Sequence, residues 1–197
     1  MRREDVTAIV LCGGSAARLG TVDKTLLPVA GRALVEYTVE ALAPQVGEIV
    51  LSCGRDPAAY EAFGYRVVSD RDSGHGPLGG IVSALPLVES EWILTHPGDT
   101  PFPDPALVER LAEAATDTGL AVPRTGDYRQ HLVMLLTRER AEELVAFYGR
   151  NGRAVKDWLD GTDVVELDMS DLGDSFFNVN TPDDLAAAER RAVGRAR

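Results

Sequence analysis

One stretch near the start of the chain limits most strongly how the chain folds: an apolar run that leads into a glycine pair. Residues 6–11 are apolar apart from one threonine, a pattern typical of a buried strand. Gly13 and Gly14 follow, and then Arg18 and Lys24. Glycines let backbone N–H groups approach an anion closely, and the two cations add full charges that backbone dipoles lack. The stretch predicts a loop that holds a phosphate chain.

The two common nucleotide-binding fingerprints do not describe this loop. The Walker A pattern needs Gly-Lys-Ser/Thr, which is absent, and Gly13-Gly14 followed by Ser15-Ala16-Ala17 does not supply the G-x-G-x-x-G of dinucleotide-binding folds. An NAD-type dehydrogenase is therefore excluded. A plain turn explains the glycines, but it does not explain Arg18 and Lys24 at this spacing.

Strand and helix patterns alternate along the first half of the chain. This alternation predicts an α/β fold with three αβα layers and a mostly parallel, twisted sheet, with ligands outside the carboxyl ends of the strands. The predicted strands cover residues 6–11, 48–52, 65–68, 92–95, 120–123, 131–136 and 163–167, with a turn at 124–128. The predicted helices cover residues 33–42, 57–63, a segment from the turn-rich stretch 69–80 to about 87, 106–115, 138–148, 152–159 and a last helix capped by Thr181 with Pro182 first.

Length and composition limit the class of protein. With 197 residues and 45% hydrophobic residues, we expect a single domain, with a nucleotide-binding half at 1–104 and an acceptor-binding half at 105–197. The net charge of −11 argues against nucleic acid and anionic membranes as partners. No apolar run is long enough to span a membrane, and residues 1–5 lead straight into a strand, so we expect a cytoplasmic protein. Cys12 and Cys53 are interpreted as two reduced, buried thiols.

Four segments then carry a resemblance to a known family: LCGGSAARLGTVDK, GPLGG, PGDTP and FFNVNTPDDL, in this order along essentially the whole chain. They resemble the molybdenum cofactor guanylyltransferases, also called molybdopterin-guanine dinucleotide synthases. These are nucleotidyltransferases with a sugar-nucleotide-transferase-like, Rossmann-like fold. The resemblance implies GTP and molybdopterin as substrates, Mg²⁺ or Mn²⁺ as the cofactor, and other proteins of molybdenum cofactor biosynthesis as further partners. We expect a monomer.

The reaction implied is attack of a phosphate oxygen on the α-phosphorus of a nucleoside triphosphate, with pyrophosphate leaving. Positioning and charge neutralisation dominate such a displacement. Arg18, Lys24 and Asp99 are the predicted catalytic residues, and Asp99, after a strand, is also the predicted metal ligand. The predicted nucleotide contacts are Leu11, Cys12, Gly13, Gly14, Lys24, Ser52, Asp70, Pro77, Leu78, Gly79 and Asp99.

The acceptor contacts rest on weaker patterns. The resemblance places Asn178 and Asn180 near molybdopterin or the metal, and Arg153 and Lys156, predicted on one helical turn, would bind the pterin's phosphate. A solvated basic face is an equal interpretation of Arg153 and Lys156.

Several of the nucleotide and histidine assignments also have plain alternatives. Asp99 and Asp70 also fit ordinary turns. Ser52 stands where the family usually has Asn. Leu132 replaces the family's Pro after His131, which favours a structural histidine, and isolated His75 and His96 make no metal site.

Three alternatives to a guanylyltransferase remain open from the sequence alone. A cytidylyltransferase for molybdopterin, or a transferase for another phosphorylated acceptor, differs from a guanylyltransferase in substrate preference. A catalytically silent module that binds nucleotide or molybdopterin would be free to lose Arg18, Lys24 and Asp99, which are all present.

Overall fold

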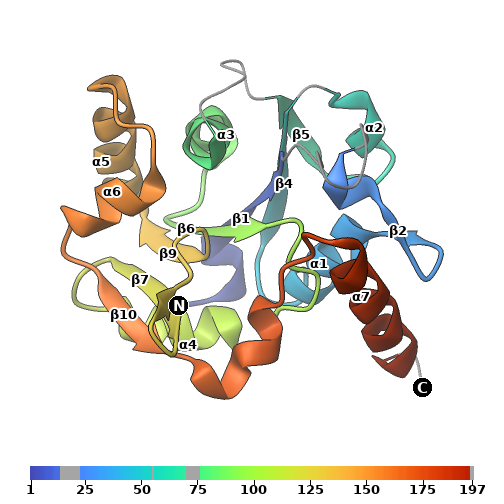
Figure 1. Cartoon of the computed structure of the whole chain (residues 1–197). Helices are drawn as coiled ribbons and strands as arrows, with labels where there is room; N and C mark the ends of the chain where they lie inside the picture. Colours follow the sequence, from blue (N-terminus) through green and yellow to red (C-terminus); the bar gives the residue numbers. More distant parts are fainter. Residues whose placement is uncertain (14–22, 55, 70–75, 196–197) are drawn as a thin grey trace.

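A mixed, mostly parallel sheet runs through the middle of the molecule (Figure 1), in a computed structural model that describes residues 1–13, 23–54, 56–69 and 76–195. The strand order is β10-β7-β9-β6-β1-β4-β5, with β8 paired to β7. Only β9 in that order runs antiparallel to its neighbours, β6 and β7. The strands are β1 (Val6–Cys12), β4 (Glu48–Cys53), β5 (Arg66–Ser69), β6 (Trp92–Pro97), β7 (Leu120–Thr125), β8 (Tyr128–Arg129), β9 (Met134–Thr137) and β10 (Val165–Asp168).

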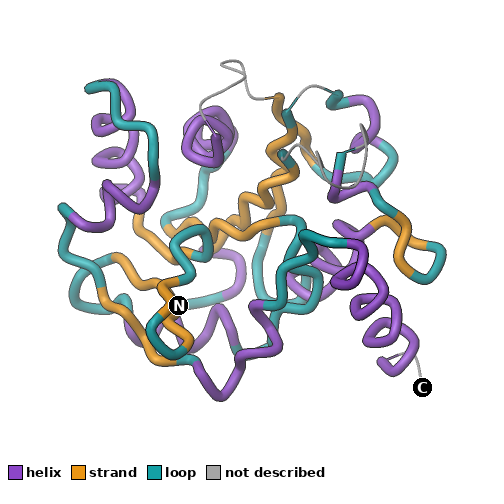
Figure 2. Tube along the Cα trace, in the orientation of Figure 1, coloured by secondary structure: helices purple, strands orange, loops and turns teal. Residues whose placement is uncertain are grey.

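Strand β1 lies at the centre of the sheet and is buried along its whole length. Its alternate side chains enter two different cores, as the two-residue period of a strand requires. Val6, Ala8 and Val10 pack with helices α1 (Leu34–Leu42) and α4 (Leu107–Ala114). Ile9 and Leu11 pack on the other face with α3 (Gly76–Ala84), α5 (Arg138–Gly149) and α6 (Val155–Asp160). Helices therefore cover both faces (Figure 2), and the predicted three-layer α/β fold is confirmed.

A third cluster joins the end of the chain to a small hairpin near its start. Strands β2 (Pro28–Val29) and β3 (Arg32–Ala33) are linked by Ala30 and Gly31, both at positive φ, as a tight two-residue hairpin turn requires. Helix α7 (Pro182–Arg195) lies beside this hairpin (Figure 1). The cluster consists of Val29, Leu34, Phe102, Val179, Ala188 and Ala192. The sequence analysis did not predict the hairpin.

The start of α7 agrees with its predicted cap. The Thr181 hydroxyl accepts a hydrogen bond from the Asp184 N–H at 3.2 Å, and Pro182 is the first helical residue. Short helices complete the chain: η1 (Arg3–Asp5), η2 (Lys24–Leu26), α2 (Ala58–Glu61), η3 (Leu85–Leu87) and η4 (Ser170–Phe176). Within the described ranges, no helix has the length and apolar character needed to cross a membrane.

Three of the differences between the predicted segments and the structure have a local cause. The strand predicted at 131–136 begins only at Met134, because Val133 N–H donates to the Gln130 carbonyl in a turn. The turn predicted at 124–128 is tighter, since β7 continues to Thr125 and pairs with β8 around Gly126, at positive φ. The helix predicted at 152–159 begins at Val155, because the backbone of Ala154 is extended, at φ −114° and ψ 131°.

Candidate active site

The loop after β6 lies directly against the end of β1. The Gly98 N–H donates to the Leu11 carbonyl at 2.9 Å. A Cβ atom at position 98 would lie 3.1 Å from the same carbonyl oxygen and 3.2 Å from Thr25 Cγ2. Glycine therefore permits the close approach that brings the residues after β6 beside those that follow β1.

Lys24 and Asp99 meet at this point. The Lys24 ammonium forms an ion pair with Asp99 Oδ2 and donates to Asn180 Oδ1 at 2.7 Å. Both charged side chains are largely buried, with exposed fractions of 12% for Lys24 and 17% for Asp99. The three residues come from η2, the loop after β6 and the segment before α7. Two of the predicted catalytic residues and one predicted acceptor residue are thus in direct contact.

The segment that carries Asn180 is fixed by its backbone. The Val179 N–H donates to the Asp99 carbonyl at 3.0 Å, and the buried Val179 side chain joins the third core cluster. Asp184 Oδ2 accepts from the N–H groups of Asn180 and Thr181 at 3.0 and 2.9 Å. These bonds, the Asn180 N–H first, hold the pKa of the Asp184 carboxyl below its ordinary value. Asn180 is therefore presented to Lys24 by an ordered helix cap.

A MobA-like NTP transferase domain is the family whose model matches residues 8–165. The chain belongs to this family. It is 37% identical to a molybdenum cofactor guanylyltransferase of Shewanella pealeana over 181 residues, which cover 90% of each chain. It also matches the crystal structure of molybdopterin-guanine dinucleotide biosynthesis protein A from Archaeoglobus fulgidus, with a TM-score of 0.78 and 27% identity, over 95% of this chain and 99% of that one. The resemblance predicted from the four segments is confirmed.

A third comparison concerns the fold alone. A Mycobacterium tuberculosis H37Rv protein, whose structure is a complex with manganese, matches with a TM-score of 0.70 and 21% identity, over 94% of this chain and 98% of that one.

The predicted nucleotide contacts Pro77, Leu78 and Gly79 lie in the first turn of helix α3, where by the family resemblance they would form a wall against the base and ribose. Pro77 is exposed, whereas Leu78 and Gly79 are buried. The buried Ser52 hydroxyl, on β4, donates to the Gly80 carbonyl at 2.8 Å. A Cβ at position 80 would lie 2.9 Å from Ser52 Oγ, so β4 and α3 are in close contact here. In this structure Ser52 holds the wall in place, and its role toward the nucleotide stays a prediction.

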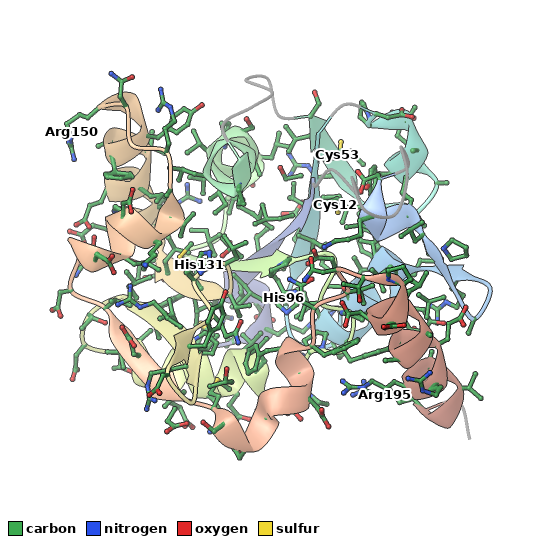
Figure 3. All side chains as sticks on the ribbon, in the orientation of Figure 1. Cys12, Cys53, His96, His131, Arg150 and Arg195 are labelled. Atoms are coloured by element: carbon green, nitrogen blue, oxygen red, sulfur yellow. The ribbon has the colours of Figure 1, made fainter. Side chains whose placement is uncertain are left out.

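The two cysteines lie at the end of the sheet. Cys12 and Cys53 are register partners on β1 and β4 and are close together in Figure 3. Both are buried, free thiols. Burial raises the pKa of Cys12 well above its ordinary value and that of Cys53 to about 11. Both groups therefore stay protonated near neutral pH and do not act as nucleophiles.

The other predicted nucleotide and acceptor residues form no hydrogen bond or ion pair with the Lys24–Asp99 pair in the part of the chain that the structure describes. Gly14, Arg18 and Asp70 lie outside the described residues. Gly13 is exposed at the end of β1, next to the buried Leu11 and Cys12, and Asn178 is exposed before α7.

Arg153 and Lys156 do not share a helical turn, which corrects the prediction, because Arg153 precedes α6. The Arg153 guanidinium donates to the Gly152 carbonyl at 2.7 Å and to Asn151 Oδ1 at 3.1 Å, and it stacks on Tyr148. Lys156 is exposed on α6, which lies on the opposite side of the molecule from α7 (Figure 1).

Asp99 fits the metal that the family implies. Its second oxygen, Oδ1, is buried and has no hydrogen-bond partner among the described residues. An unsatisfied buried carboxylate oxygen is a hard ligand of the type that Mg²⁺ and Mn²⁺ prefer. No group of three or more His, Cys, Asp or Glu side chains that could hold a metal ion occurs in the part of the chain described.

Sequence reasoning missed two residues that support the site. Thr25 and Tyr60 are both buried, and their hydroxyl oxygens lie 2.5 Å apart behind Lys24. Thr25 directly follows Lys24, which offered a weak signal. Tyr60 belongs to a four-residue helix with no motif, and only the fold brings it to this place.

Proposed function

We propose that this protein transfers GMP from GTP to the terminal phosphate of molybdopterin and releases pyrophosphate. The observation that carries the proposal is the contact of Lys24 with both Asp99 and Asn180 at the carboxyl end of the sheet. The names of the relatives support the substrates, since the Shewanella pealeana protein is a molybdenum cofactor guanylyltransferase.

In this proposal Lys24 is the cation that meets the triphosphate. In the structure its charge is neutralised by Asp99. An incoming triphosphate carries several negative charges, so Lys24 exchanges the carboxylate for a phosphate oxygen, and Asn180 Oδ1 keeps the ammonium in place during this exchange. The exposed backbone at Gly13 offers a further donor at the end of β1, and Arg18 is proposed beside the departing pyrophosphate.

Asp99 is the residue that would hold the metal, through Oδ1, which has no hydrogen-bond partner among the described residues. The bound Mg²⁺ or Mn²⁺ supplies positive charge that stabilises the negative charge of the reacting phosphates. Manganese in the Mycobacterium tuberculosis relative supports a divalent ion here. No covalent enzyme intermediate is needed, because the acceptor phosphate is itself the nucleophile.

The other end of the proposal concerns the acceptor. We propose that Asn178, Asn180, Arg153 and Lys156 contact molybdopterin, of which only Asn180 contacts the Lys24–Asp99 pair in the structure. The monomeric state, the cytoplasmic location and further partners from molybdenum cofactor biosynthesis stay predictions.

Pyrophosphate release tests the proposal directly. The purified protein is given GTP, CTP or ATP with Mg²⁺, with and without molybdopterin. Release that needs both GTP and molybdopterin supports guanylyl transfer. Release with CTP instead assigns a cytidylyltransferase, release with GTP and a different phosphorylated acceptor reassigns the second substrate, and nucleotide binding without release indicates a silent binding module.

A further inference from the structure

We infer that Tyr60 is a positioning residue for Lys24, acting through the Thr25 hydroxyl and the Cys12 carbonyl. The inference rests on the role proposed above for Lys24 in binding the triphosphate. Tyr60 does not touch the ion pair itself, so it is not a catalytic residue. Nothing in the motifs of the sequence points to it.

The Tyr60 phenol lies at the junction of the two segments that flank residues 14–22. Its hydroxyl donates to the Cys12 carbonyl at 3.1 Å, at the end of β1, and lies 2.5 Å from Thr25 Oγ1, in η2. The whole side chain is buried, with an exposed fraction of 1%. A buried phenol oxygen requires hydrogen-bond partners, and the Cys12 carbonyl and the Thr25 hydroxyl serve as such.

Thr25 transmits this constraint to Lys24. Asp23 Oδ1 accepts from the Thr25 N–H at 3.1 Å and lies 3.0 Å from the Thr25 hydroxyl. The Asp23 carboxylate therefore caps the single turn that begins at Lys24. The Tyr60 and Thr25 hydroxyls thus have two hydrogens for three contacts: Tyr60 donates to the Cys12 carbonyl, and the Thr25 hydrogen is shared between the Tyr60 oxygen and Asp23 Oδ1. Lys24 lies between Asp23 and Thr25 in the sequence, so a shift of the Thr25 backbone also moves the backbone of Lys24.

The same threonine also sets the distance to Asp99. Gly98, the residue before Asp99, is so close to Thr25 that a Cβ there would lie 3.2 Å from Thr25 Cγ2. A shift of Thr25 therefore changes the separation of Lys24 and Asp99 at both ends of the pair. Because small displacements of a charged donor reduce catalysis strongly, a residue that fixes Thr25 affects the reaction at a distance.

Burial keeps Tyr60 in the state that this role needs. Desolvation raises the pKa of the Tyr60 phenol far above its ordinary value, so the hydroxyl keeps its proton and continues to donate at any pH at which the protein is folded.

The test removes only the hydroxyl, with Tyr60→Phe. The dissociation constant of GTP with Mg²⁺ is measured by calorimetry, together with kcat and the unfolding midpoint in urea. We expect GTP binding to weaken about tenfold, the upper range for one buried hydrogen bond. The matched control is Tyr37→Phe, since the Tyr37 hydroxyl also donates to a backbone carbonyl, that of Val29, at 2.9 Å. The control is expected to bind GTP as the wild type does.

A double-mutant cycle separates positioning from a general loss of stability. In a Lys24→Met background, Tyr60→Phe should weaken GTP binding less than about twofold, because the residue it positions is already gone. An equal loss in both backgrounds overturns the inference, and so does wild-type affinity in Tyr60→Phe. If Lys24→Met alone binds GTP normally, the proposed role of Lys24 fails, and this inference fails with it.

A second variant covers the case in which Tyr60→Phe does not fold. Thr25→Val removes the other hydroxyl of the contact at nearly constant volume. We expect it to weaken GTP binding about as much as Tyr60→Phe, and the effect should again vanish with Lys24→Met. A loss that persists in that background contradicts the inference.

Discussion

Lys24 and Arg153 were both predicted to bind phosphate, but the fold places them very differently. Lys24 is mostly buried and contacts Asp99 and Asn180, which come from distant parts of the chain. Arg153 is exposed, and its hydrogen bonds end on residues within five positions of it. A cation that long-range contacts hold in place is preorganised for a ligand, whereas a locally bonded cation is free to reorient. Partners far apart in sequence are thus the better sign of a site.

Asp99→Asn is the strongest way to break this comparison. The variant keeps the shape of the side chain but removes the charge that the metal and Lys24 need, so we expect turnover to fall at least about a thousandfold. Pyrophosphate release measures the loss, and circular dichroism checks the fold. Asp171→Asn, at an exposed aspartate paired with Arg110, is the control and should keep its activity. Retained turnover in Asp99→Asn would remove Asp99 from the metal role.

Lys24→Met should have the next largest effect. Methionine keeps the apolar part of the side chain and removes the ammonium, so we expect kcat/KM for GTP to fall about a hundredfold or more. Steady-state kinetics at saturating acceptor measures it. A rate close to that of the wild type would make Lys24 an ordinary structural lysine, no different in function from Arg153.

Burial of His96, at the end of β6, is expected to affect the stability of the fold. The side chain, labelled near the middle of the molecule in Figure 3, is fully buried, and burial lowers its pKa to about 4. The unfolded chain binds a proton near pH 6.5, which the folded state refuses until about pH 4, so stability falls as the pH drops through this window. The loss from pH 7 to about pH 5 should be about 2 kcal/mol.

Urea unfolding at the two pH values measures this loss. His96→Asn, which keeps a donor near the Pro97 carbonyl but does not titrate, should show a smaller dependence on pH. The same pH dependence in His96→Asn and the wild type would show that His96 does not control it.

The smallest effect is expected on the other side of the comparison. If Arg153 and Lys156 bind the acceptor, replacing both by Met should raise KM for molybdopterin about tenfold and leave KM for GTP unchanged. Steady-state kinetics with each substrate varied in turn measures both constants. An unchanged KM for molybdopterin would assign the two residues to a solvated basic face.

The regular part of the fold could be predicted because its patterns are local. Strand β1 is an apolar run, and helix α7 begins with a threonine cap and a proline, so both were predicted from a few neighbouring residues. The antiparallel direction of β9 was not predicted, because the chain reverses around Gly126 into the short strand Tyr128–Arg129, which looks like part of a loop in the sequence. The start of α6 was missed because no neighbouring residue type indicates that the backbone leaves the helical conformation between Asn151, at positive φ, and Ala154, which is extended.

The site was predicted only as far as motifs reach. Lys24 and Asp99 stand in recognisable segments that follow parallel strands ending at one edge of a sheet, so they were expected to meet, whereas Asn180 was placed near molybdopterin or the metal by the family resemblance. Tyr60 and Thr25 could not be assigned in this way, since their contact depends on the packing of a short helix against the end of β1. Supporting residues of this kind become visible only when the chain is folded.

The hydrogen bond from Val179 to the carbonyl of Asp99 has a consequence for synthesis on the ribosome. A nascent chain that has emerged only as far as η4 already carries Lys24 and Asp99. It still lacks Asn180 and the Val179 N–H that donates to the Asp99 carbonyl. The ion pair would then form before its third member arrives. The centre described here is thus complete only after residue 180 has been made.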